Sequence, residues 1–212
     1  MLTVLTSDQP RHRYLINRLS EVDSVFAVMQ TFNRVHTKIE DPIMDEYFER
    51  MRLAENLTFP RMELKAHTIT TKLEGLKVPL GRVIVFGCEW IKGELYEQIK
   101  DRAINIHMGI GYRGASCNAH AIAEGRNHLV GATVQRLSKG LDCGEPLFYA
   151  YADKRYIDPF MFGMSAVKSS IDKLVDYLLN GHTVVDEPTD KFSCYKSKTD
   201  FTIEIAKKIL KI

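Results

Sequence analysis

Short apolar runs alternate with amphipathic stretches at the start of the chain. Leu2–Thr6 and Val25–Met29 have the composition of buried β-strands. Between them, Pro10 follows a Ser-Asp-Gln segment, which is a signal for the start of a helix, and Leu15 and Leu19 then share one helical face. A strand, a helix and a strand in this order predict a parallel α/β sheet.

The same patterns extend through the rest of the chain. Residues 82–86 are the clearest strand, because a continuous apolar run of this length suits a strand that is buried on both faces. Further strands are predicted at 103–107, 131–136 and 146–152, and helices at 40–58, 93–100, 118–124, 165–179 and near 201–210. Residues 60–81 are ambiguous, and 108–116 and 138–144 have the composition of loops.

Together these elements predict a doubly wound, mostly parallel α/β sheet of the Rossmann-like type. We expect a main domain over residues 1–160 and a small helical and β extension over residues 161–212 that packs on it. The apolar residues of the 146–152 strand and of the terminal helix could also form the surface of a homodimer.

Composition and charge exclude several classes of protein. The 212 residues are 45% hydrophobic and 26% charged, which is typical of a globular protein and excludes a disordered or collagen-like chain. The 29 Lys and Arg residues against 27 Asp and Glu give no support for nucleic-acid binding. No run reaches the roughly 18–20 apolar residues of a membrane span, and the N-terminus lacks the pattern of a secretory signal. The four cysteines form no C-x-x-C pair, so we expect reduced thiols and a cytoplasmic location.

Three polar side chains follow or end the predicted strands. Asn105 and His107 are two residues apart on one strand and therefore face the same side, and Asp142 lies in the loop after the 131–136 strand. Because ligands bind at the carboxyl ends of parallel strands, we expect these three groups to meet there. An amide that donates to an oxyanion, an imidazole that moves a proton and a carboxylate that orients the imidazole suit acyl transfer to an amine. The spacing alone does not distinguish such a site from a structural histidine.

Four short motifs in order make the pattern more specific. They are Asn105-Ile106-His107, Tyr112-Arg113-Gly114, Gly131-Ala132-Thr133 and Leu141-Asp142-Cys143-Gly144. In this order the stretch 104–149 resembles the folate-dependent formyltransferase family, which includes glycinamide ribonucleotide, methionyl-tRNA and sugar formyltransferases. The preceding strand–glycine–turn–helix segment from residue 82 is also similar to that family, and the opening segment from Thr6 to His12 is most similar to the sugar N-formyltransferases.

The resemblance implies a reaction and a set of roles. It implies transfer of a formyl group from 10-formyltetrahydrofolate, as the cofactor, to a primary amine. Asn105 would hold the formyl oxygen, His107 would act as general base or oxyanion donor, and Asp142 would tune His107 and order a water. The expected cofactor-binding residues, whose backbone would hold the pterin, are Phe86, Gly87, Cys88, Glu89, Trp90, Ile91, Leu137, Gly140 and Leu141. The expected substrate-binding residues are Arg11, His12, Met108, Tyr112 and Arg113.

The departures from the family pattern limit which class of acceptor substrate the sequence favours. The family usually has a Ser- and Pro-containing loop after the histidine, whereas residues 108–111 are Met-Gly-Ile-Gly and look shortened. The chain lacks the Gly-rich phosphate loop of the purine-pathway members near its N-terminus, and we expect it to be too short for the C-terminal RNA-binding domain of the methionyl-tRNA formyltransferases. These last two features and the opening segment from Thr6 to His12 favour a nucleotide-linked amino sugar. A ribonucleotide or an aminoacyl acceptor remains an alternative, as does a non-catalytic folate- or nucleotide-binding module.

We expect no metal site and no nucleic-acid or membrane partner. His120 and His128 are eight residues apart and do not lie on one helical face, so they do not form a ligand pair.

Overall fold

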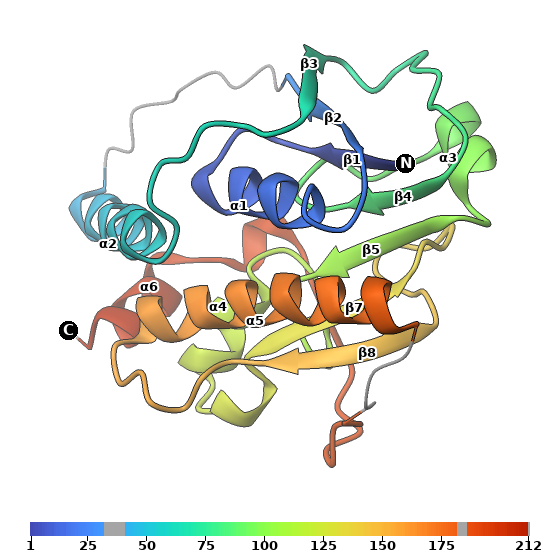
Figure 1. The fold of residues 1–212 in the computed structure, drawn as a ribbon. Coiled ribbons are helices and arrows are strands. Elements are labelled where there is room, and N and C mark those ends of the chain that lie inside the picture. Colours follow the sequence, from blue (N-terminus) through green and yellow to red (C-terminus); the bar gives the residue numbers. More distant parts are fainter. Residues whose placement is uncertain (32–40, 182–185, 212) are drawn as a thin grey trace.

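A seven-stranded sheet runs through the centre of the molecule, in the order β3-β2-β1-β4-β5-β7-β8 (Figure 1). The computed structural model describes residues 1–31, 41–181 and 186–211. The strands are β1 (Leu2–Thr6), β2 (Val25–Gln30), β3 (His67–Thr71), β4 (Arg82–Val85), β5 (Ala103–His107), β7 (Gly131–Arg136) and β8 (Pro146–Tyr151). The first five are parallel to one another, β7 is antiparallel to its neighbour β5, and β8 is antiparallel to β7. The predicted mostly parallel α/β class is confirmed.

Helices cover both faces of this sheet. The helices are α1 (Pro10–Leu19), α2 (Pro42–Thr58), α3 (Gly93–Ile99), α4 (Cys117–Ala123), α5 (Pro159–Asn180) and α6 (Ile203–Leu210), and there are 3-10 turns at Asn127–Leu129 and Lys198–Asp200. Helices α1, α2 and α5 share one apolar cluster with Val4 and Ile84, whereas α3 packs on the opposite face with Leu5 and Val85. Alternate residues of β1 and β4 therefore point into two separate cores, as the apolar runs of these strands predicted.

Two helices begin with the same capping arrangement. The Asp41 side chain accepts hydrogen bonds from two backbone N–H groups at the start of α2, and the Asp158 side chain does the same for α5. In both cases proline occupies the first helical position, where the missing N–H has no intrahelical partner. The Asp158-Pro159 pair explains why α5 begins at residue 159 and not at the predicted residue 165. Residue 40 of the predicted 40–58 helix lies outside the described residues.

The direction of β7 corrects the reasoning that led to Asp142. His107 pairs with Thr133 and Ile104 pairs with Arg136, so β7 ends where β5 begins. The Leu137 N–H then donates to the Ala103 carbonyl at 2.9 Å. The loop after β7 therefore starts at the edge of the sheet opposite His107. It must return along the sheet to reach the site, so the expectation that Asp142 follows the carboxyl end of a parallel strand was wrong.

One strand of a second, two-stranded sheet lies inside the segment 108–116, which was predicted as a loop. This sheet consists of β6 (Tyr112–Gly114) and β9 (Cys194–Lys196), which run parallel. Three-residue strands carry no usable periodicity, and the partner strand comes about 80 residues later in the chain. The ambiguous segment 60–81 contains the edge strand β3, whose residues are half-buried or exposed.

The carboxyl-terminal part of the chain shares the core of the main sheet. The predicted domain boundary at residues 160 and 161 falls in the first turn of α5, and this helix packs against β7, β8, α1 and α2. Residues 182–185 and 212 lie outside the described part. Several apolar residues assigned to a dimer surface are buried within the chain itself: Phe148, Ala150, Ala206, Ile209 and Leu210. The homodimer stays a prediction, but these buried side chains cannot be part of its surface.

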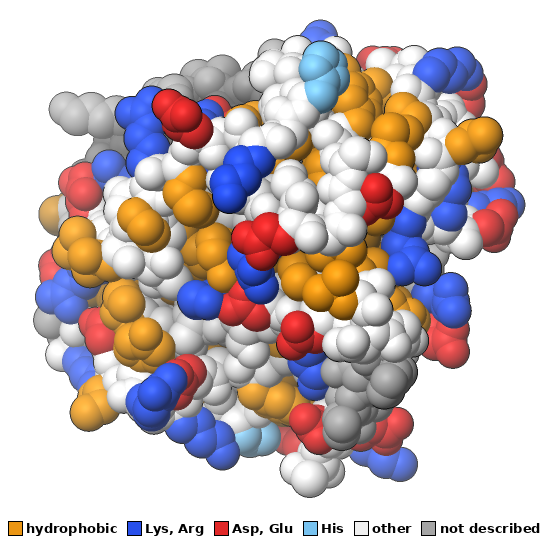
Figure 2. Space-filling view, viewed as in Figure 1, with side chains coloured by type: hydrophobic (Ala, Val, Ile, Leu, Met, Phe, Trp, Pro, Cys, Tyr) orange, Lys and Arg blue, Asp and Glu red, His pale blue; other side chains and the backbone are white. Residues whose placement is uncertain are grey.

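The surface carries charges of both signs. Figure 2 shows basic and acidic side chains interspersed over the face that α1 and α5 cover. None of the described helices is both long and apolar enough to cross a membrane.

His120 of α4 is buried against the carboxyl-terminal segment and provides a pH-sensitive contact. Its ring lies edge-on to Phe201 at 6.3 Å, and neither ring nitrogen has a hydrogen-bond partner among the described residues. Burial lowers the pKa of His120, Lys196 lowers it further, and Glu124 and Asp200 oppose this shift. The pKa of His120 is therefore lower in the folded protein than in the unfolded chain, where it has the ordinary value of about 6.5.

From this difference we expect the free energy of unfolding to fall as the pH drops below about 6.5. Replacing His120 with Leu should make that decline shallower, because the group that takes up the proton on unfolding is gone. Urea denaturation between pH 5 and pH 8 measures the effect, with His67→Gln on the exposed edge strand as the control. Equal slopes for the wild type and His120→Leu would contradict it.

Candidate active site

Asn105 and His107 project from the same face of β5, and Asp142 lies against both. The Asn105 Nδ2 is 3.4 Å from the Asp142 Oδ1, and the His107 Nδ1 is 3.2 Å from the Asp142 Oδ2. The His107 side chain is 8% exposed and that of Asp142 is 11% exposed, so water screens their interaction weakly. The structure thus brings the predicted amide, imidazole and carboxylate together. Their catalytic role stays a prediction.

Backbone geometry aims the Asp142 carboxylate. Asp142 has a φ of +51°, in the left-handed region that aspartate adopts more readily than most residues. The Gly114 N–H donates to the Asp142 Oδ2 at 3.1 Å. One carboxylate therefore contacts β5 and β6 together, and this contact closes the returning loop over the face of the sheet.

The second nitrogen of His107 is also engaged. Its Nε2 lies 2.7 Å from the Tyr112 carbonyl oxygen. A neutral imidazole has one N–H, so only the doubly protonated imidazolium donates to both Tyr112 and Asp142. Sequence reasoning did not find this contact, because a backbone carbonyl leaves no mark on residue type.

Gly109 lets the loop approach His107 closely. A Cβ atom at this position would lie 2.9 Å from the His107 Nε2, 2.9 Å from the Tyr112 carbonyl oxygen and 2.7 Å from the Cys117 Cβ. These distances are too short for real side-chain contacts. The absence of a side chain at Gly109 therefore allows the histidine and the carbonyl to meet.

A cleft of about 410 Å³ opens beside the cluster. Its lining includes His107, Asp142, Arg113, Tyr149 and residues 187–188 and 190–193. Segment 187–193 was not predicted as part of the site, because it lies 80 residues beyond the histidine. Gly111 is a sequence feature that indicates a close backbone contact, because a Cβ there would lie 2.5 Å from the Phe192 carbonyl oxygen. The sequence does not show that Phe192 is the residue it contacts.

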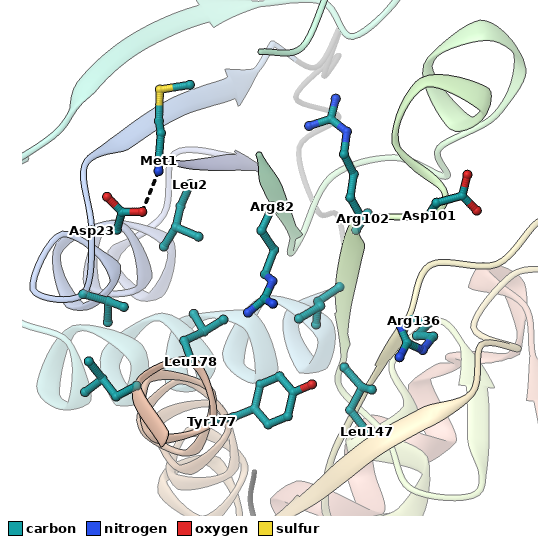
Figure 3. A pocket seen from close by; sticks show the side chains of 14 residues that line it. Met1, Leu2, Asp23, Arg82, Asp101, Arg102, Arg136, Leu147, Tyr177 and Leu178 are labelled. Atoms are coloured by element: carbon teal, nitrogen blue, oxygen red, sulfur yellow. Dashed lines mark hydrogen bonds and ion pairs between the residues drawn. The ribbon is translucent and has the colours of Figure 1, made fainter. Parts of the chain in front are cut away.

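A larger cleft of about 710 Å³ lies at the opposite edge of the sheet, where β4 and β5 begin (Figure 3). Arg82, Arg102 and Arg136 line it, together with apolar residues from α5. Arg102 donates to the carbonyl oxygens of Pro79 and Gly81, so this guanidinium supports the chain around it. Among the described residues that line it there is no histidine or cysteine, and we therefore place the candidate active site in the smaller cleft.

The expected pterin-binding segments border one apolar cluster. Cys88 and Leu137 both pack against it, and Ile91 is one of its buried members. Burial raises the pKa of the Cys88 thiol to about 12, so it stays protonated near neutral pH. Trp90 is exposed beside them. These two segments therefore flank the same side of the sheet, although among the described residues neither lines the cleft of His107.

Two other expected cofactor contacts are part of the packing of this turn. The Phe86 N–H donates to the Leu5 carbonyl, and Glu89 forms two 2.8 Å hydrogen bonds with the buried Gln30 side chain. Gly87 has a φ of +68°, and a Cβ there would overlap the His12 ring. Gly140 and Leu141 lie in the returning loop, exposed and half-buried, respectively.

The expected substrate contacts at Arg11 and His12 are engaged in helix packing. Arg11 Nη1 pairs with Glu55 Oε2 at 2.9 Å, which ties α1 to α2. The His12 ring is buried, its Nδ1 lies 2.9 Å from the Ser7 Oγ, and it packs edge-on against Phe86. The structure does not bring these two side chains to the cleft.

The remaining expected substrate contacts lie close to His107. Arg113 lines the cleft, its Nη1 is 2.8 Å from the Cys143 Sγ, and its buried Nε has no partner among the described residues. Tyr112 lines the cleft but its side chain is 1% exposed overall, and Met108 is half-buried between two apolar clusters. Arg113 is thus the expected residue best placed to meet a ligand. In residues 1–31, 41–181 and 186–211 no group of three His, Cys, Asp or Glu side chains could hold a metal ion.

Comparisons with known proteins agree with this architecture. No protein-family model matches the sequence, and a search of curated proteins finds no match. A sugar N-formyltransferase from a Shewanella species superposes with a TM-score of 0.60 at 15% identity, over 94% of this chain and 77% of that one. A 4-N formyltransferase from Francisella tularensis superposes with a TM-score of 0.60 at 14% identity, over 99% of this chain and 86% of that one.

A third solved structure is the formyltransferase PseJ from Anoxybacillus kamchatkensis. It is similar over 94% of this chain and 86% of its own, with a TM-score of 0.53 and 18% identity. This chain has the formyltransferase fold. The fold-level expectation from the four sequence motifs is confirmed, and identities this low carry nothing finer than the fold.

Proposed function

We propose that this chain is an N-formyltransferase that moves a formyl group from 10-formyltetrahydrofolate to the primary amine of a nucleotide-linked amino sugar. The observation that carries the proposal is the cluster of Asn105, His107 and Asp142 at the edge of a cleft. The formyltransferase fold supports the reaction class. The structure of PseJ is a complex with UDP-4,6-dideoxy-4-formamido-L-AltNAc and tetrahydrofolate, which supports both the donor and the kind of acceptor.

The three side chains suit the charge changes of this reaction. The amine nitrogen forms a bond to the formyl carbon, the bond from that carbon to the folate nitrogen breaks, and one proton passes from the amine to the folate nitrogen. Asn105 donates to the formyl oxygen as negative charge develops on it. Asp142 and the Tyr112 carbonyl hold the His107 ring at the same place, where it would act as general base or as oxyanion donor. Asp142 orients this ring and holds a water that relays the proton.

The donor and the acceptor would approach from different sides. The pterin would lie against residues 86–91 and 137–141, which border one apolar cluster and offer main-chain groups to its flat edge. The acceptor would enter the cleft, where Tyr149 and Phe192 provide apolar surface and the Arg113 Nε has no other partner among the described residues. The donor supplies an activated formyl group when it is bound.

One observation favours a second candidate, a non-catalytic folate- or nucleotide-binding module. Both nitrogens of His107 already face protein oxygens, so the ring has no free nitrogen for a substrate oxygen in this conformation. Such a protein would bind folate or a nucleotide without transferring the formyl group. Turnover and binding measured side by side separate the two candidates.

The test is a formyl-transfer assay on the purified chain. We expect tetrahydrofolate release that requires a nucleotide-linked amino sugar, with the formylated amine detected by mass spectrometry. Asn105→Ala should lower kcat about a hundred- to a thousandfold, because the oxyanion loses its donor. Turnover with glycinamide ribonucleotide alone would refute the sugar acceptor. Binding of 5-formyltetrahydrofolate without turnover on any amine would refute the enzyme and support the binding module.

A further inference from the structure

Tyr112 connects the candidate active site to an ion pair on its far side. Its carbonyl oxygen faces the His107 Nε2 at 2.7 Å, and its hydroxyl donates to the Glu124 Oε2 at 2.6 Å. The Lys196 ammonium donates to the Glu124 Oε1 at 2.8 Å and lies 5.9 Å from the centre of the Tyr112 ring. The buried Tyr112 therefore contacts the His107 imidazole through its carbonyl, and through its side chain it contacts Lys196 of β9 and Glu124 at the end of α4.

The backbone of β9 holds the same segment at both ends. The Cys194 N–H donates to the Gly111 carbonyl at 2.8 Å, and the Ala115 N–H donates to the Lys196 carbonyl at 2.9 Å. Between these bonds lie Tyr112, which faces His107, and Gly114, whose N–H donates to Asp142. The position of β9 thus fixes where the two backbone partners of the catalytic cluster lie.

Two glycines make this close pairing possible. Gly111 has a φ of +73° and Gly114 a φ of +98°, both in the region where a side chain is strained. A Cβ at Gly114 would overlap the Lys196 carbonyl oxygen. The chain at β6 is therefore suited to backbone contact with β9 on one side and with Asp142 on the other.

The protonation states of Tyr112 and Glu124 favour a fixed arrangement of the hydrogen bonds among Tyr112, Glu124 and Lys196. Burial raises the pKa of Tyr112, and the neighbouring Glu124 raises it further, so the phenol remains a donor. Burial alone would raise the pKa of Glu124, but the hydrogen bonds from Lys196 and Tyr112 outweigh burial and lower it. A carboxylate that accepts from an ammonium and a phenol forms charge-assisted bonds, which are short and directional.

We propose that Glu124 and Lys196 are positioning residues that act through Tyr112 to orient the imidazole of His107. The inference rests on the proposed function and extends it, because it assigns a role in formyl transfer to the carboxyl-terminal segment. Both residues lie behind Tyr112, and their side chains act on the imidazole through its carbonyl. The alternative is that the ion pair does nothing more than fasten β9 to α4.

Lys196→Met and Glu124→Gln test the proposal by kinetics. Each should lower kcat roughly ten- to a hundredfold, because a small displacement of a catalytic group has that effect. The KM values of both substrates should change much less, since neither residue lines the cleft, and Lys196→Arg should restore most of the activity. Lys207→Met, which breaks an exposed ion pair with Glu204, is the matched control and should leave kcat unchanged.

Nitrogen-15 NMR of histidine-labelled protein provides a readout that does not need turnover. We expect Lys196→Met to shift the ring-nitrogen resonances of His107, which His107→Ala identifies by their loss, and Lys207→Met to leave them in place. If Lys196→Met lowers the melting temperature but leaves kcat and the resonances unchanged, the proposal is overturned, and the ion pair only stabilises the packing of β9. If the wild type transfers no formyl group, the proposed function fails, and the resonances still decide whether the network orients His107.

Discussion

Replacing His107 with Ala should lower kcat for formyl transfer about a thousandfold, within the roughly hundred- to ten-thousandfold range of a positioned proton-transfer or charge-stabilising group. The substitution removes the ring beside Asn105 and leaves the Asp142 carboxylate buried without its ring partner. The formyl oxygen would then develop negative charge next to an uncompensated carboxylate. Single-turnover measurements isolate this step from product release.

Asp142→Asn refines the same experiment. It keeps the shape of the side chain but replaces the acceptor that faces the His107 Nδ1 and the Gly114 N–H with a neutral amide. We expect kcat to fall by a similar factor, because the His107 ring loses the carboxylate that orients it. The control is His67→Ala, on the exposed edge strand β3, which should retain full activity. Near wild-type turnover in both His107→Ala and Asp142→Asn would show that the cluster is structural.

Replacing Phe148 with Ala should destabilise the fold by about 3–5 kcal/mol, the usual effect of truncating a buried aromatic side chain. Phe148 is fully buried on β8, where its ring packs against Tyr177 of α5 at 5.6 Å between centroids. The strand is fixed between β7 and the helix, so the cavity cannot collapse easily. Urea denaturation should show a lower midpoint with an unchanged slope.

The matched control for the core variant is Ile157→Ala. Ile157 is 90% exposed in the segment before α5, and truncating it should change stability by less than about 0.5 kcal/mol. A loss below 1 kcal/mol for Phe148→Ala would contradict the packing of β8 against α5. It would then reopen the assignment of this strand to an intermolecular surface.

Local patterns were reliable where a segment is long and has a clear face. The strands near residues 2, 25, 82, 103, 131 and 146 and the helices between them agree with the structure to within a few residues, apart from the start of α5. There the apolar periodicity predicted residue 165, whereas the cap at Asp158 and the following proline set the start at residue 159. A capping signal six residues before the periodic face was present in the sequence but was not used.

The sequence could not supply the direction of β7. An alternation of apolar residues identifies a strand but is the same for parallel and antiparallel pairing. Asp142 nevertheless reaches His107, because the loop returns along the sheet and its φ of +51° turns the carboxylate inward. The contact between Asp142 and His107 was therefore predicted correctly, but the expectation that Asp142 follows the carboxyl end of a parallel strand was wrong.

The sheet-forming runs, the helix faces and the side chains that can stabilise a negative oxygen follow from the order of the amino acids, because these depend on residue type and spacing along a short segment. The surroundings of His107 come from the folded chain: the Tyr112 carbonyl, the returning Asp142 loop and the β9 segment from about 80 residues later. Backbone groups are chemically the same at every residue. Their contribution to a site therefore depends on where the folded chain places them and cannot be read from the order of the side chains.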